Sequence, residues 1–427
     1  MRKYRVVIRA FTCRRDVAPM EVLKRLLERR GCEVILANTR NFHITVKYWK
    51  PNAIVVNTLS DVMIKKQYPN SKVVFFSGEG FHGPNDSHAK IWLEKPEYFE
   101  NMDLGLVWGA KVKEECAERF TEGSDLSKIH VVGNPKLDLI KFLPEKLKNN
   151  KKNSIGFIGR FPKLNDHLAR SCMYFLSTDF QVEEAITQCK SANAMIRAAK
   201  KILEETDLRV SIRPHPHEQI ESYPENISVW FDKKYHDRVD IDDTLFLPTW
   251  IAQQKALLSP TSTSFLESYM LDVPVINLDY LSDIVDFNQN YVSFTKEWQE
   301  AALMPKTYDD LITLLADNEA LKVNNDPAIE KQLKEFDKSE DESACLNAAN
   351  CIMDSLKSTK EQSGLHVPYA IVDLWDEISF RRNMRWNNRH QNFCYRRGYH
   401  KIPDYIDDII NSIEKSSSKT PEIKKAA

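Results

Sequence analysis

Short apolar runs alternate with helical patterns over the first 145 residues. Tyr4–Ala10 predicts a strand, and Pro19–Arg30 predicts a helix because its leucines recur at helical spacing. The apolar runs that follow predict further buried strands at Cys32–Ala37, Ala53–Asn57, Val73–Phe76, Leu104–Trp108 and Ile129–Val132. Strands separated by single helices favour a parallel sheet with right-handed crossovers. The pattern predicts a Rossmann-like domain over residues 1–145.

A polar, lysine-rich stretch at Lys146–Asn153 predicts an interdomain linker, after which the alternation resumes. Ser154–Ile158 predicts a strand, and Val182–Leu203 predicts a long amphipathic helix. The other predicted elements are strands at Arg209–Ile212, Ile227–Phe231, Ala256–Leu258 and Val273–Leu278, with a helix at Ser262–Leu271. A second Rossmann-like domain is therefore expected over residues 154–306. Ligands are expected in a cleft that the two domains face with their strand ends.

Residues 307–427 have helical periodicity. The expected helices are Asp309–Leu315, Ile329–Phe336, Ala344–Leu356, Tyr369–Met384 and Tyr405–Ile413. We expect this extension to pack back on the N-terminal domain. The fold class expected is α/β, with two Rossmann-like domains and a helical C-terminal extension.

Composition narrows the class of protein. Sixty basic and 61 acidic side chains give a net charge of -1, so the charge of the whole molecule argues neither for nor against nucleic acid, and any polyanion site must be local. No nucleic-acid partner is expected. Eight cysteines are scattered without a CxxC pair, which favours reduced thiols in a cytoplasmic protein. Neither a secretory signal nor a membrane-spanning run is evident.

The stretch from Gly78 to Gly83 reads Gly-Glu-Gly-Phe-His-Gly after a predicted strand. Its literal GxGxxG does not favour a dinucleotide site, because Pro84 follows and Glu79 would face a pyrophosphate. Flanking Gly78 and Gly80 would instead let Glu79 approach a substrate closely. Glu79 is therefore a candidate general base or nucleophile, and the alternative is a solvated loop glutamate.

A second candidate is His215, in Arg213-Pro214-His215-Pro216 after a predicted strand. The two prolines fix the backbone, and the histidine could donate a hydrogen bond or a proton to a departing phosphate. Arg213 could offset the phosphate charge, as could Arg160 after the first strand of the second domain. The alternatives are a structural histidine and a surface arginine. His217 has no third metal ligand nearby in sequence, so no metal is expected.

Ser262, Thr263 and Ser264 end a hydroxyl-rich run before a helix that contains Glu267. Amides at a helix start together with hydroxyls predict a phosphate site, while simple N-capping is the alternative. Glu267 would accept hydrogen bonds from ribose hydroxyls. Asp240-Ile241-Asp242-Asp243 is interpreted as a solvated loop and not as a metal site.

Residues 379–401 interleave seven basic side chains with aromatics. This composition suits anionic lipid head groups or a glycan, and the alternative is a helix that packs on the first domain.

The ordered motifs resemble the bacterial surface carbohydrate biosynthesis protein family. They are Gly78-Glu79-Gly80, Val107-Trp108-Gly109, Gly133-Asn134-Pro135 with Asp138, and the Arg-Pro-His-Pro run, across about residues 50–280. More distantly they resemble GT-B enzymes that use CMP-activated sugar acids, such as sialyltransferases and β-Kdo transferases. Their acidic-acidic-Gly motif corresponds to Glu79-Gly80, with Gly78 in place of the first acidic residue.

The resemblance implies a GT-B transferase of capsule or lipopolysaccharide synthesis. It would move a Kdo-like ulosonic acid from a CMP donor to a glycan or lipid-linked glycan, without a further cofactor and at the inner membrane. In this scheme Glu79 and His215 are catalytic, Arg160, Arg213, Ser262, Thr263, Ser264 and Glu267 bind the nucleotide, and Asn134 supports a loop. The alternatives are a UDP- or GDP-sugar transferase, a nucleotide-sugar 2-epimerase, and an inactive scaffold.

Overall fold

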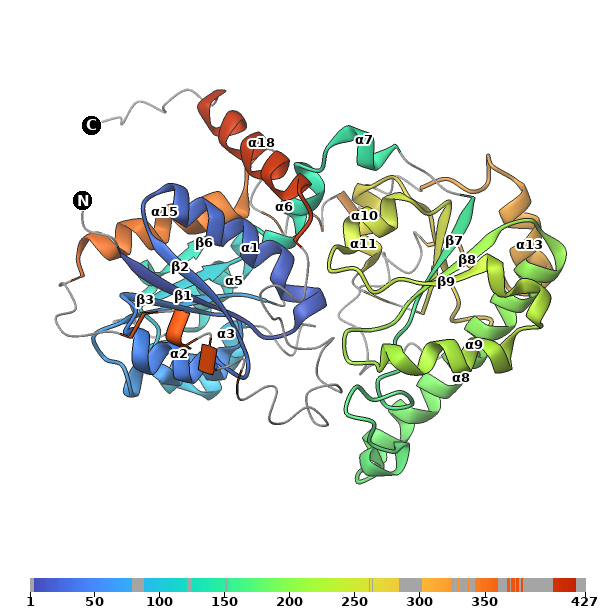
Figure 1. The fold of residues 1–427 in the computed structure, drawn as a ribbon, viewed down its shortest axis with the longest axis horizontal. Coiled ribbons are helices and arrows are strands. Elements are labelled where there is room, and N and C mark those ends of the chain that lie inside the picture. Colours follow the sequence, from blue (N-terminus) through green and yellow to red (C-terminus); the bar gives the residue numbers. More distant parts are fainter. Residues whose placement is uncertain are drawn as a thin grey trace. The chain divides into compact units, whose positions relative to one another are not determined.

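The chain folds into two compact units in a computed structural model (Figure 1). The residues described are 4–78, 88–120, 125–149, 153–260, 262, 264–283, 302–323, 342–359 and 402–419, with scattered positions between 327 and 378. Unit 1 comprises residues 1–144, 331–384 and 394–427, and unit 2 comprises residues 145–330 and 385–393.

Unit 1 contains a six-stranded parallel sheet in the order β2-β1-β3-β4-β5-β6. The strands are β1 (Arg5–Ala10), β2 (Glu33–Asn38), β3 (Ala53–Val56), β4 (Lys72–Phe76), β5 (Leu104–Val107) and β6 (Ile129–Val131). The helices between them are α1 (Cys13–Arg29), α2 (Phe42–Trp49), η1 (Leu59–Lys66), α3 (His88–Glu94), α4 (Pro96–Glu100), α5 (Ala110–Arg119) and η2 (Leu126–Lys128), and α6 (Pro135–Lys141) follows β6. Every residue of β1 and β3 is buried, as expected for parallel strands that are covered on both faces.

Unit 2 contains a five-stranded parallel sheet in the order β11-β10-β7-β8-β9. Its strands are β7 (Ser154–Ile158), β8 (Arg209–Arg213), β9 (Val239–Ile241), β10 (Ala256–Ser259) and β11 (Val275–Asn277). Its helices are α7 (Glu145–Lys148), η3 (Cys172–Phe175), α8 (Asp179–Glu205), η4 (Ile220–Ser222), α9 (Tyr223–Trp230), η5 (Lys233–Arg238), α10 (Leu247–Ala252), α11 (Ser264–Met270) and α13 (Tyr308–Ala316). Two Rossmann-like units in tandem confirm the predicted fold class.

The structure corrects three local predictions. The expected strand Ile227–Phe231 is helical: α9 has Pro224 in its first turn and buries Tyr223 and Ile227 one helical turn apart. The third strand of the sheet is instead β9, which lies partly within the Asp240–Asp243 run that was interpreted as a loop. Helix α1 begins at Cys13, six residues before the expected Pro19, because its first turn is already buried.

Two C-terminal helices return to unit 1. Helix α15 (Ala344–Lys357) packs along α1, and α18 (Tyr405–Lys419) also contacts α1. Ile406, Ile409, Ile410 and Ile413 give α18 an apolar face that is fully buried. Helix α13, by contrast, contacts α8 and belongs to unit 2.

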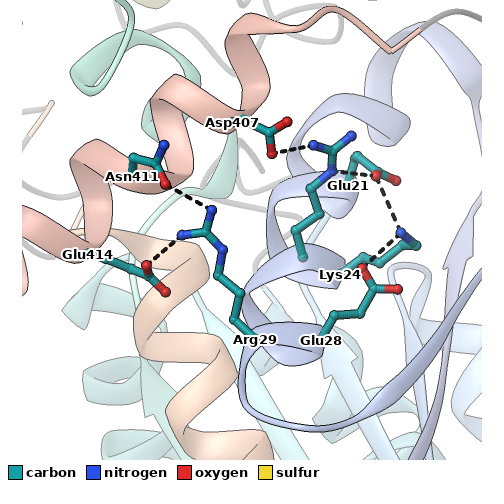
Figure 2. Close-up of polar contacts among 8 residues, drawn as sticks. Glu21, Lys24, Glu28, Arg29, Asp407, Asn411 and Glu414 are labelled. Carbon is teal, nitrogen blue, oxygen red and sulfur yellow. Dashed lines mark hydrogen bonds and ion pairs between the residues drawn. The ribbon is translucent and has the colours of Figure 1, made fainter.

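Charged side chains border the contact between α1 and α18 (Figure 2). Arg25 pairs with Asp407 at 2.5 Å, and Arg29 donates to Glu414 at 2.5 Å and to Asn411 at 2.8 Å. These side chains remain partly exposed, so the ion pairs contribute little compared with the buried isoleucines.

The Gly133-Asn134-Pro135 motif packs closely against Asp337 and Ala344, the first residue of α15. Gly133 has φ +102°, and a Cβ there would lie 2.5 Å from Asp337 Oδ1, so only glycine fits. The Asn134 side chain caps α6 by accepting from Lys136 N at 3.0 Å, while Asn134 N donates to Asp337 Oδ1 at 3.1 Å. The motif therefore joins the end of β6 to a residue 203 positions later in the chain.

Asp138 binds the start of α15 through three hydrogen bonds. Its carboxyl group accepts from Ser343 Oγ at 2.7 Å, Ala344 N at 2.9 Å and Cys345 N at 2.8 Å. These amides belong to the first turn of α15, which has no intrahelical partner for them. Complete burial raises the pKa of Asp138 from 3.8 to about 6.

We expect the apolar face of α18 to outweigh its ion pairs. Ile410→Ala should lower the free energy of unfolding of unit 1 by about 2–4 kcal/mol, because it leaves a cavity. Arg29→Ala should cost less than about 1 kcal/mol. Urea denaturation followed by circular dichroism measures both, and equal losses would contradict this ranking.

The raised pKa of Asp138 predicts a pH dependence. The folded state binds the proton of Asp138 more tightly than the unfolded chain does, so protonation of Asp138 stabilises the fold. This contribution is complete below about pH 4 and is lost as the pH rises through about 6. The free energy of unfolding of the unaltered chain, minus that of Asp138→Asn, should fall by about 3 kcal/mol over this window. Denaturant titrations at pH 4, 5, 6 and 7 measure the difference, and a flat profile would show that Asp138 does not titrate there.

Candidate functional site

The candidate site lies at the carboxyl edge of the unit 2 sheet. Ile158 of β7 pairs with Arg213 of β8, and Leu258 of β10 pairs with Phe157 of β7. Arg160, His215 and Ser262 thus follow three adjacent central strands at nearly matched register. The strand order changes direction between β7 and β10, and ligands of open α/β sheets bind at such a switch point.

A buried carboxylate, Glu218, joins two of these loops. Its Oε1 accepts from Phe161 N after β7 and from His215 N after β8, both at 2.9 Å. Its Oε2 accepts from Tyr223 Oη at 2.5 Å. Glu218 is 1% exposed, and loss of such partners would leave buried amides unsatisfied. The carboxylate therefore holds Arg160 and His215 on neighbouring loops.

Gly159 allows these loops to approach each other. A Cβ at this position would lie 3.0 Å from Glu218 Oε1 and 3.2 Å from Pro214 Cα. Gly159 N donates to Arg213 O at 2.8 Å, which continues the pairing of β7 and β8 by one residue. Any side chain here would separate the two loops.

Three histidines meet beside this carboxylate. The His217 ring lies 5.4 Å from the His215 ring and 5.4 Å from the His167 ring. Burial lowers the pKa of His167, so this ring is neutral near pH 7. In the part of the chain that the structure describes, no three His, Cys, Asp or Glu side chains are arranged to hold a metal ion.

Arg213, predicted to bind the nucleotide, is buried in a contact within unit 2. Its guanidinium pairs with Asp242 and donates to Thr244 O at 2.8 Å. The same group lies 5.8 Å from the centroid of the Trp250 ring. Asp242 is therefore a buried partner and not the solvated loop residue expected. Arg213 positions the segment after β9.

Two described serines of the predicted phosphate loop bond to each other. Ser262 Oγ accepts from Ser264 N at 3.3 Å and donates to Ser264 Oγ at 3.2 Å, as in a turn that a serine side chain stabilises. Glu267 is buried in α11. Thr263 lies outside the described residues, so its assignment stays a prediction.

In unit 1, Gly78 follows β4 and packs against the end of β3. A Cβ on Gly78 would lie 3.1 Å from both Asn57 Cβ and Asn57 O. A side chain at position 78, where the acidic-acidic-Gly pattern has its first acidic residue, would therefore require Asn57 to move by a few tenths of an ångström. Glu79, Gly80 and residues 379–401 lie outside the described residues. Asn134 caps α6 and contacts Asp337.

The sequence pattern pointed neither to Glu218 nor to the partner of Asp242. Glu218 stands only three residues after His215, but a glutamate in a polar loop gives no sign of burial. Asp242 was named without a partner, since its pairing with Arg213 spans 29 residues. Among the described residues, every helix is too short or too polar to cross a bilayer.

Comparison with known proteins identifies the architecture. No protein-family model and no curated protein matches the chain. The wall teichoic acid polymerase TagF is similar in structure, with a TM-score of 0.52 and 13% identity over 83% of this chain and 90% of TagF. UDP-GlcNAc 2-epimerase from Methanocaldococcus jannaschii has a TM-score of 0.48 and 11% identity over 82% of this chain and 99% of the epimerase. The chain has the GT-B fold, with two Rossmann-like units in tandem.

Proposed function

We propose that the chain is a glycosyltransferase that uses a nucleotide-activated sugar to build bacterial surface polysaccharide. The observation that carries the proposal is the placement of Arg160, His215 and Ser262 after three adjacent strands beside the switch point of the unit 2 sheet. A guanidinium, an imidazole and a hydroxyl at one sheet edge suit the phosphate of a nucleotide.

The proposed reaction breaks the bond between the anomeric carbon of the donor and its phosphate oxygen. The bonding electron pair goes to the phosphate, and an acceptor hydroxyl oxygen forms the new bond to the anomeric carbon. Arg160 and His215 would stabilise the charge that develops on the phosphate. Arg213, which is paired with Asp242, would act only by positioning the neighbouring segment.

Glu79 would take the proton that the acceptor hydroxyl loses. This role rests on the sequence, where Glu79 follows Gly78 directly after the β4 strand of unit 1.

For the donor, we propose a pyrimidine nucleotide, with a CMP-linked ulosonic acid as the choice that the sequence resemblance favours. TagF, which shares the fold, has been studied after a soak with CDPG, so cytidine and uridine diphosphates belong in the same screen. The acceptor would be a glycan or a lipid-linked glycan. The basic and aromatic residues 379–401 would bring the protein to an anionic inner-membrane surface.

Removing the candidate phosphate ligand should weaken nucleotide binding selectively. Arg160→Ala should raise the Kd for the best binder among CMP, CDP and UDP by about tenfold or more, since a charged hydrogen bond contributes about 1.5–3 kcal/mol. Isothermal titration calorimetry measures the affinity. Arg209→Ala is the matched control, because Arg209 is exposed and begins β8 at the opposite edge of the sheet. Equal losses in both variants, or no binding by the unaltered chain, would count against the proposed site.

Loss of the proposed base should affect transfer alone. Glu79→Gln should leave the Kd for the nucleotide within about threefold and lower the transfer rate by at least about 100-fold. Radiolabel transfer from CMP-, CDP- and UDP-activated sugars to a surface glycan extract measures the rate. Full activity in this variant would refute the assignment of Glu79.

A further inference from the structure

The hydrogen bond to one ring nitrogen of His215 determines what this side chain can do. His217 N donates to His215 Nδ1 at 3.2 Å. A backbone amide can only donate, so Nδ1 must carry a lone pair. The single proton of the neutral imidazole is then on Nε2.

Hydrogen bonds hold the backbone of His215 and His217 in place. Glu218 Oε1 accepts from His215 N at 2.9 Å, and Glu218 N donates to His215 O at 2.8 Å, so both backbone polar groups of His215 are held by Glu218. His217 O in turn accepts from His167 N at 3.0 Å. The flanking Pro214 and Pro216 restrict φ on both sides of the histidine. The amide of His217 is thus fixed relative to the His215 ring.

This arrangement limits the chemistry of His215. A proton added at Nδ1 would face the His217 amide hydrogen and replace an attraction with a repulsion. A neutral ring that already carries its proton on Nε2 cannot accept another there. The remaining capability is donation of a hydrogen bond from Nε2, and an anionic oxygen is the best acceptor for it.

We propose that His215 acts as a neutral Nε2–H donor to a phosphoryl oxygen without transferring a proton, and that Glu218 and the His217 amide are positioning groups that fix this tautomer. The proposal rests on the proposed function, because it assumes that the ligand at this edge carries a phosphate. It assigns to Glu218 a role that acts through His215 and involves no contact with the ligand.

Two substitutions separate donation from proton transfer. The side-chain amide nitrogen of glutamine reaches the place of Nε2, whereas that of asparagine reaches the place of Nδ1. His215→Gln should raise the Kd for the best binder among CMP, CDP and UDP, and lower the transfer rate, by only several-fold, because glutamine keeps a hydrogen-bond donor at the place of Nε2. His215→Asn should weaken binding by about tenfold or more. Equal loss of transfer in both variants would overturn the proposal, because a proton-transferring histidine tolerates neither.

The pH profile gives a second readout. If position 215 is uncharged, the unaltered chain and His215→Gln should show the same change in Kd between pH 6 and 8, because the phosphate titrates equally in both. An affinity that increases at low pH only in the unaltered chain would show a charged imidazole and overturn the proposal.

The tautomer can also be measured without any ligand. Long-range proton–nitrogen spectra of the full chain labelled with 15N-histidine, with His215→Gln to assign the signal, should show His215 protonated at Nε2 alone at pH 7.5. Protonation at Nδ1 would refute the tautomer even if the chain bound no nucleotide. If instead the tautomer is confirmed and no nucleotide binds, the proposed function fails and so does the phosphoryl acceptor assigned to His215.

The positioning role of Glu218 has its own control. Glu218→Ala removes the oxygen that accepts from Phe161 N and His215 N, so it should raise the Kd several-fold and increase the Nδ1-protonated fraction of His215, while thermal unfolding shows that the variant remains folded. Glu225→Ala, an exposed change on nearby α9, should change neither. An unchanged tautomer and an unchanged Kd in Glu218→Ala would show that Glu218 does not position His215.

Discussion

One buried carboxylate organises the carboxyl edge of the unit 2 sheet. Glu218 accepts from amides that belong to loops after two different strands, and its own amide closes a second contact to His215. A buried carboxylate is costly unless its acceptor positions are filled, so the two loops must stay at the distance that fills them. Gly159 makes that distance possible, because any larger residue would separate the loops. The positions of Arg160 and His215 therefore depend on Glu218 and Gly159.

The alternating pattern was sufficient to predict the fold, because parallel strands buried on both faces are recorded in the sequence as continuous apolar runs. It was not sufficient for β9, a three-residue strand that contains Asp240 and is followed by two more aspartates, a composition typical of a loop. It also failed at Ile227, where a short apolar run fits a strand and a helix equally well. Tertiary burial decides whether such a run forms a strand or a helix, and burial cannot be read from the local sequence.

The candidate site was predicted in part. Arg160, His215 and Ser262 could be placed because strand ends fix their edge of the sheet, but the role of Arg213 could not. Its partner Asp242 lies 29 residues away, and a pair at that separation leaves no periodic signal. The same holds for Asp138, whose acceptors bind the start of a helix more than 200 residues later. Long-range polar pairs of this kind decide which charged residues remain available for a ligand.

The tight contact between Gly78 and Asn57 concerns main chain as well as side chain. A Cβ at position 78 would meet the carbonyl oxygen of Asn57 as closely as its Cβ, so trimming Asn57 to a smaller residue would not make room. Any side chain at position 78 would therefore require the ends of these two neighbouring strands to move apart by a few tenths of an ångström, and glycine lets them pack without that shift.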